Sequence, residues 1–274
     1  MKQNKIEYSG KSRALFALAV VAVIGVAVGL FVGYRQLRDL WLEQCVIKDP
    51  SAQVAITSGK MVKADVLAAE FGLRKGANLA LIDFEARRRE VLKKIPNLRS
   101  VRISRKLPDK VAIVAEERTP VARMNVLGRK AETGRVVDTD GVVFVWQRGT
   151  QMLPTIRETQ APGTAVGNRL DGRALAALRL IESSQETGRA DLGVLEVDIS
   201  KQDFLLVTLG NYNLAKVAWE GMDDPTPATR ANLDLQLTNL AKAVRSRVGE
   251  GAQSWNATDT STPGRIYADM KGQL

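Results

Sequence analysis

The feature that most constrains this chain is an uncharged apolar run near its N-terminus. Residues 14–34 read ALFALAVVAVIGVAVGLFVGY and contain no charged side chain. At a rise of ~1.5 Å per residue, a helix of this length spans roughly 30 Å, the thickness of the hydrocarbon core of a bilayer. The apolar region of a cleaved signal peptide is shorter, usually about 7–15 residues. The sequence therefore predicts an uncleaved transmembrane helix over residues 14–34.

The charges that flank this run predict its orientation. Four basic residues and one acidic residue precede it, whereas residues 35–43 carry two of each sign. Because an excess of Lys and Arg marks the cytoplasmic side of a membrane helix, we expect residues 1–13 to be a cytoplasmic tail. The bulk of the chain then lies on the far side of the membrane.

Three glycines are spaced four residues apart within the apolar run. Gly25, Gly29 and Gly33 would form one face of the helix, where small residues let a second helix approach closely. Glycine is also common in membrane helices that have no such role. Both interpretations stay open at this point.

The composition argues against several kinds of active site. The chain has no histidine, which removes the commonest general base and metal ligand. Its single cysteine, Cys45, can form neither an internal disulfide nor a Cys–His pair. Asp138, Asp140 and Gly141 begin like a calcium loop, but the closing Glu does not follow, so we expect a turn. We assign no catalytic, cofactor-binding or metal-binding residue. The sequence does not exclude a catalytic Ser–Lys pair, but it contains no motif for one.

The residues after the apolar run predict a stalk and then a small α+β domain. Residues 35–52 are polar, and residues 53–118 contain alternating and helical patterns. These patterns predict a strand, two helices and two strands over residues 53–57, 63–71, 84–95, 99–105 and 110–116. Val66, Leu67 and Phe71 are expected on one face of the first helix, and Asp83 is expected to cap the second. Two helices on one face of this sheet would bury enough surface for a domain.

Residues 119–274 predict a larger β-rich domain with two helices. The expected elements are a hairpin, a helix, three strands, a long helix, a loop and a last short strand. They cover residues 135–146, 171–186, 194–199, 204–209, 214–219, 225–248, 249–264 and 265–270. Leu233, Leu237, Leu240, Val244 and Val248 form the apolar stripe of the long helix.

Basic residues gather between residues 87 and 110, within a net charge of +10 for the whole chain. We expect Arg87, Arg88, Lys93 and Lys94 to form a basic surface on the second helix. Nucleic acid is not expected as a partner, because the segment lies outside the cytoplasm and lacks the aromatic residues that stack on bases. Anionic lipid headgroups or an acidic partner would suit this surface, and a merely solvated face suits the pattern equally.

Four stretches, in this order behind a membrane helix, resemble the FtsQ/DivIB family of bacterial cell-division proteins. They are Lys75–Asp83 (KGANLALID), Ile95–Pro108 (IPNLRSVRISRKLP), Glu117–Ala122 (ERTPVA) and Val137–Phe144 (VDTDGVVF). The resemblance implies a POTRA domain at residues 53–118 and a β domain at residues 119–274. It also implies a non-enzymatic scaffold of the division complex in the cell inner membrane, with a periplasmic bulk that is enriched at the septum.

The resemblance also implies the partners and where they bind. In this family, the coiled-coil pair FtsB/FtsL adds a strand to the last strand of the β domain. The protein is thereby connected to the machinery of septal cell-wall synthesis. The corresponding residues here are Arg265, Ile266, Tyr267, Ala268, Asp269, Met270 and Lys271. The chain departs from the family pattern at Gly272, where an aromatic residue is usual. Open backbone groups on such an edge provide affinity, and alternate side chains provide specificity.

Two functions from other classes stay open on the sequence alone. One is a membrane-anchored enzyme of the cell envelope with a POTRA-like domain, and the other is an adaptor for envelope assembly or secretion.

Overall fold

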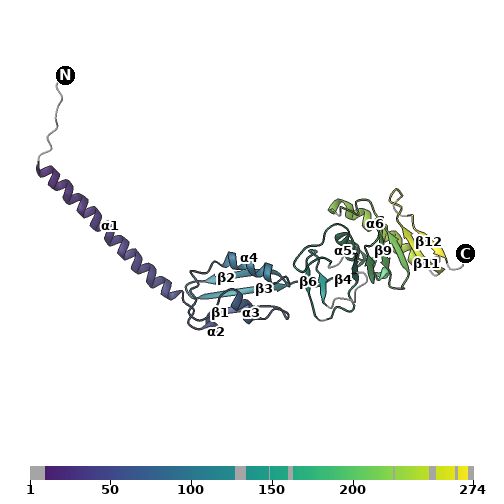
Figure 1. Ribbon diagram of the computed structural model, residues 1–274, viewed down its shortest axis with the longest axis horizontal. Helices are drawn as coiled ribbons and strands as arrows, with labels where there is room; N and C mark the ends of the chain where they lie inside the picture. The colour runs from purple at the N-terminus through teal and green to yellow at the C-terminus, as the bar shows by residue number, and fades with distance from the viewer. Residues whose placement is uncertain are drawn as a thin grey trace, which may run out of the picture. The chain divides into compact units, whose positions relative to one another are not determined.

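The computed structural model of the chain describes residues 10–126, 134–147, 149–159, 163–224, 226–246, 251–262 and 265–270 (Figure 1). The first element is helix α1, Gly10–Gln44, which contains the predicted span and continues ten residues beyond it. Its apolar side chains from Leu15 to Tyr34 are almost all exposed. Among the described residues, this is the one helix long and apolar enough to cross a membrane. The helical continuation means that much of the predicted stalk is an extension of the anchor.

The small sheet contains the described strands β1 (Val54–Thr57), β2 (Leu98–Lys106) and β3 (Lys110–Glu117) in the order β1-β3-β2. Strand β1 runs parallel to β3, with Val54 opposite Val111. Helix α2 (Pro50–Gln53) precedes β1, and α3 (Ala64–Glu70) and α4 (Phe84–Lys94) lie between β1 and β2. The predicted order of strand, helix, helix, strand and strand is therefore confirmed.

Local signals in the sequence explain the ends of these helices. Gly72 has φ +71°, and the N–H of Leu73 donates to the carbonyl of Ala68 at 2.8 Å, which closes α3. The Asp83 carboxylate accepts from the N–H groups of Glu85 and Ala86 at 3.1 and 3.0 Å, so the predicted cap of α4 is confirmed.

The buried face of α3 differs from the prediction at one residue. Leu67 and Phe71 are fully buried, but Val66 is 43% exposed. Positions four apart lie on the same side of a helix, whereas adjacent positions are about 100° apart. In a helix as short as α3, only the Leu67 side reaches the core, and the expectation for Val66 was wrong.

The chain divides into two compact units. The first contains residues up to Thr57, Ala64–Arg88 and Arg102–Val114, and the second contains Ser58–Lys63, Arg89–Val101 and Ala115–Leu274. The division passes through the small sheet and not after it.

The large sheet contains nine described strands in the order β12-β11-β10-β9-β8-β7-β4-β5-β6. Their bounds are β4 Ala122–Val126, β5 Arg135–Val137, β6 Val143–Val145, β7 Thr155–Glu158, β8 Glu196–Asp198, β9 Leu205–Thr208, β10 Leu214–Val217, β11 Ala252–Ala257 and β12 Tyr267–Met270. Helix α5 (Gly172–Ser184) connects β7 to the parallel strand β8, and α6 (Pro227–Arg245) connects β10 to the parallel strand β11. The predicted mixed sheet with two helices is confirmed.

Both helices contribute to one core with the sheet. Leu178 and Ile181 of α5 are fully buried, and so is the predicted stripe of α6 at Leu233, Leu237 and Leu240. Val248, the last residue of that stripe, lies outside the described residues. The buried residues alternate with half-buried ones in β9 and with exposed ones in β10, as expected for strands with one covered face.

Two of the family-like stretches meet at a buried ion pair in the second unit. Arg118 follows β3 and donates to the Asp138 carboxylate at 2.5 Å, and its Nε donates to the Pro96 carbonyl at 3.0 Å. Asp138 is 2% exposed and also accepts from the N–H groups of Asp140 and Val142 in the β5–β6 hairpin. Every contact of this carboxylate fixes either Arg118 or the hairpin turn. The expected turn at these residues is therefore confirmed.

We predict that Asp138→Ala lowers the free energy of unfolding by about 3–5 kcal/mol, because the buried Arg118 loses its closer counter-charge and keeps only Asp140, at 3.4 Å. Asp140→Ala is the matched control. Asp140 lies 3.1 Å from Arg99 and 3.4 Å from Arg118, and its side chain is 34% exposed. Because Asp138 keeps the shorter contact with Arg118 in this variant, we expect a loss of at most about 1 kcal/mol. Urea unfolding of the full chain in detergent, followed by tryptophan fluorescence, measures both. Equal losses in the two variants would contradict this role of Asp138.

Candidate partner-binding edge

Strand β12 occupies one end of the large sheet and pairs antiparallel with β11. Tyr267 lies opposite Asn256, and Ala268 lies opposite Trp255. The strand begins two residues later than predicted, so Arg265 and Ile266 precede it. Lys271, which the sequence analysis assigned to the same edge, lies outside the described residues.

Contacts on both faces of the sheet hold β12 against β11. Ile266 and Ala268 are half-buried and pack against the core on the helix-covered face. On the opposite face, the Ser254 hydroxyl donates to the Asp269 carboxylate at 2.6 Å. An irregularity in β11 between Ala252 and Ser254 shifts the register of this pairing. Bulges of this kind increase the local twist of a sheet edge.

The remaining side chains of β12 are available at the surface. Tyr267 is 53% exposed, Met270 is 37% exposed, and Asp269 is exposed, as is Arg265 just before the strand. This edge therefore presents an aromatic, an aliphatic and two charged side chains next to its backbone groups. Alternate residues of an edge strand point their N–H and C=O groups away from the sheet.

The strand that supports this edge was missed in the sequence. We expected a loop over residues 249–264, but β11 occupies residues 252–257 and buries Ala252, Trp255 and Ala257. The small polar residues around Trp255 hide the alternation of a strand. The signal that could have found it is the long helix α6, because a helix after β10 commonly leads to a parallel neighbouring strand.

The opposite end of the large sheet is closed. The outer side of β6 bonds to the segment 167–170: the N–H of Val143 donates to the Asn168 carbonyl at 2.9 Å, and the N–H of Gly167 donates to the Val143 carbonyl at 2.7 Å. The Asn97 side chain donates to the Val145 carbonyl at 2.6 Å. In the part of the chain that the structure describes, no segment pairs in this way with the outer side of β12.

The other predicted surfaces are distributed over α1 and α4. Gly25, Gly29 and Gly33 have open space beside their Cα atoms. On α4, Arg87, Lys93 and Lys94 are exposed, whereas Arg88 is half-buried and forms an ion pair with Glu85 at 2.8 Å. The packing role of the glycines and the ligand of the basic residues stay predictions.

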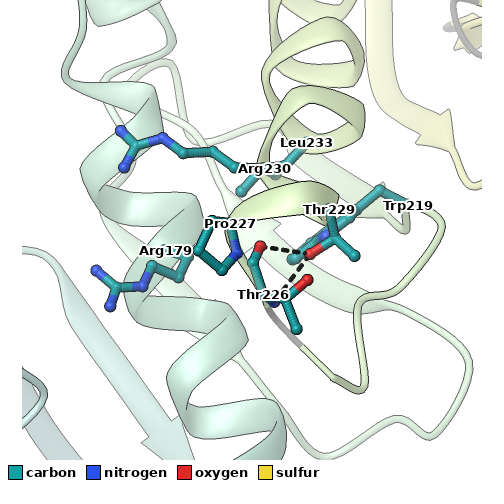
Figure 2. Close-up of a pocket in the computed structure, with 7 residues that line it drawn as sticks. All are labelled: Arg179, Trp219, Thr226, Pro227, Thr229, Arg230 and Leu233. Atoms are coloured by element: carbon teal, nitrogen blue, oxygen red, sulfur yellow. Dashed lines mark hydrogen bonds between the residues drawn. The ribbon is translucent and has the colours of Figure 1, made fainter.

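Figure 2 shows a pocket of about 210 Å³ between α5 and the first turn of α6. It is lined by Arg179, Trp219, Thr226, Pro227, Thr229, Arg230 and Leu233. Its arginines form ion pairs with Glu182 and Glu186, and its threonines bond to each other and cap the helix. The polar groups are therefore engaged within the chain, and we assign no ligand to this pocket. In addition, the described residues include no group of three or more acidic or Cys side chains that could hold a metal ion.

Comparisons with known proteins agree with this architecture. The family described as "POTRA domain, FtsQ-type" matches residues 50–118, which contain α2, the small sheet and both of its helices. The chain is also 28% identical over 244 residues to the cell division protein FtsQ of Streptomyces collinus, a match that covers 85% of this chain and 83% of that protein. The relative and helix α1 together support a single-pass membrane protein. These findings together support the FtsQ/DivIB family of cell-division proteins, with an FtsQ-type POTRA domain at residues 50–118 and a larger β region after it.

Proposed function

We propose that this protein is a non-enzymatic scaffold of the division complex that captures a partner by strand addition to β12. The observation that carries the proposal is the difference between the two ends of the large sheet. Chain segments close the β6 end, whereas β12 has an outer side that pairs with no described segment. Because open N–H and C=O groups on an edge favour pairing with another strand, β12 suits an extended segment of a partner.

The partner that fits the family is a coiled-coil pair similar to FtsB/FtsL, with septal peptidoglycan synthesis as the process that it serves. The β domain then lies in the periplasm, with residues 1–13 in the cytoplasm. This orientation follows from the charges that flank the span. The proposed domains are residues 53–118 for the POTRA domain and 119–274 for the β domain that binds the partner.

We predict that Tyr267→Ala weakens capture of the FtsB/FtsL pair by about tenfold or more, because exposed tyrosines at the centre of an interface commonly carry much of its affinity. Tyr212→Ala is the matched control, since Tyr212 is 79% exposed in the turn between β9 and β10. Tyr267→Pro removes a backbone donor from β12 and should reduce capture at least as much. Co-purification of the full chains from detergent, with titration of the pair, measures these effects. Unchanged capture by both Tyr267 variants, with unfolding midpoints like wild type, would rule out this edge.

We also predict that a fluorescent protein fused to the N-terminus of the full chain forms a mid-cell band in dividing cells. A fusion to residues 1–44 alone is the control, because it keeps the anchor and lacks both sheets. Microscopy of constricting cells provides the measurement. A diffuse envelope signal from the full chain would argue for the envelope enzyme or adaptor and against the division role.

A further inference from the structure

Within the first unit, α1 is joined to the POTRA domain without a flexible linker. Helix α1 ends at Gln44, and the next residue, Cys45, is fully buried, as is Ile47. The N–H of Leu79 donates to the Cys45 carbonyl at 2.9 Å, and the N–H of Ile47 donates to the Ala77 carbonyl at 2.8 Å. The residues directly after the membrane helix are thus held to residues 77–79 of the domain by backbone hydrogen bonds.

Asn78 ties the same loop to the helix itself. Its side-chain amide donates to the carbonyl of Leu42 at 2.9 Å, and its side-chain oxygen accepts from the N–H of Ala80 at 3.0 Å. The last carbonyls of a helix have no partner within the helix, so this bond completes the end of α1. The loop that contains Asn78 is therefore fixed beside the last turn of α1.

A second loop lies at the same end of the small sheet. The buried side-chain oxygen of Gln53 accepts from the N–H groups of Lys48 and Asp49 at 2.7 and 2.8 Å. Its amide donates to the Asp109 carboxylate, in the β2–β3 turn, at 3.0 Å. Gln53 thus holds the β2–β3 turn beside the residues that follow α1.

Together these segments form a basic surface, which we call the membrane-proximal end. Its exposed basic residues are Lys48, Arg74, Lys75, Lys106 and Lys110. Leu81 and Leu107 project from the same loops with 73% and 55% of their surface exposed. Nearby acidic residues are Glu43, Asp49 and Asp109, of which Asp49 accepts from Ser51 and Asp109 accepts from Gln53. Basic side chains around exposed leucines suit an anionic bilayer surface, where the leucines enter the interface and the cations pair with headgroups.

The length of α1 brings this end close to the membrane. Beyond the uncharged span, Leu37, Leu40 and Trp41 remain 70%, 58% and 44% exposed on the helix. Tryptophan is enriched at the level of the lipid headgroups, and Cys45 lies only ~6 Å along the helix axis from Trp41. With Trp41 at that level, the segment that follows α1 begins within about one Debye length, ~8–10 Å, of the headgroups.

We propose that the membrane-proximal end of the POTRA domain binds anionic phospholipid headgroups and holds the domain against the bilayer. The proposal rests on α1 crossing a membrane, and it is independent of the strand addition at β12. It also assigns this contact to residues other than the basic surface on α4.

The experiment uses the full chain in nanodiscs of phosphatidylcholine alone or with one quarter phosphatidylglycerol. In a Cys45→Ala background, an environment-sensitive fluorophore is attached to Leu81→Cys or Leu107→Cys. The control position is Val114→Cys, which is 49% exposed on β3 and lies ~17 Å along the strand from Asp109. A probe at Val23→Cys verifies insertion of α1. Quenching by acrylamide, a neutral molecule, reports how far each probe is shielded from water.

We expect the quenching constant at Leu81 and Leu107 to fall about threefold when phosphatidylglycerol is added, with no change at Val114. The triple variant Lys48→Gln, Lys75→Gln and Lys106→Gln should abolish this fall. The control triple variant Lys93→Gln, Lys201→Gln and Lys242→Gln, at exposed positions elsewhere, should retain it.

Two results would overturn the proposal: probes at Leu81 and Leu107 that quench like the one at Val114 in both lipids, or an equal effect of the two triple variants. Since the assay contains no division protein, failure here leaves capture at β12 intact. Conversely, loss of capture by Tyr267 variants leaves the lipid contact intact.

Discussion

The unpaired backbone at the ends of an open sheet is the constraint on which the rest of this structure depends. Each edge strand carries N–H and C=O groups that need partners, and long exposed edges invite pairing with other chains. This protein treats its two ends differently. The segment 167–170 and the Asn97 side chain close β6, while none of the described segments pairs with the outer side of β12. This difference between the two ends is the basis of the proposed partner site at β12.

Strand β12 is supported by the neighbouring strand β11 and by helix α6, which covers the sheet. Helix α6 returns the chain from the end of β10 to the start of the parallel strand β11, which therefore lies between β10 and β12. Trp255 of β11 is buried in the core that this helix shares with the sheet. At the start of the β domain, the Arg118–Asp138 pair fixes the chain that leaves β3 against the β5–β6 hairpin. A partner strand added at β12 therefore meets a backbone already ordered by the core, which reduces the entropic cost of binding.

The sequence was sufficient for elements with clear local signals. The uncharged run and the Asp83 cap each depend on residues within or directly beside a single helix, and both were predicted. Strand β11 was not, because its alternation is hidden by small polar residues and its pairing with β10 spans the whole of α6. The candidate edge could be located at residues 265–270 from the family resemblance. That β6 is closed could not be predicted, because it depends on Asn97 and residues 167–170, which lie far from β6 in sequence.

The short length of β12 explains why a membrane anchor matters for a strand-addition site. The four residues of β12 offer few backbone hydrogen bonds, each with a net value of about 1 kcal/mol, so the backbone alone supports binding in the millimolar range. Side chains such as Tyr267 add affinity, but the area remains small. A partner that is anchored in the same bilayer is confined near this protein, and its effective concentration rises without any new contact. If β12 captures a partner as proposed, helix α1 therefore strengthens that capture although it does not belong to the site.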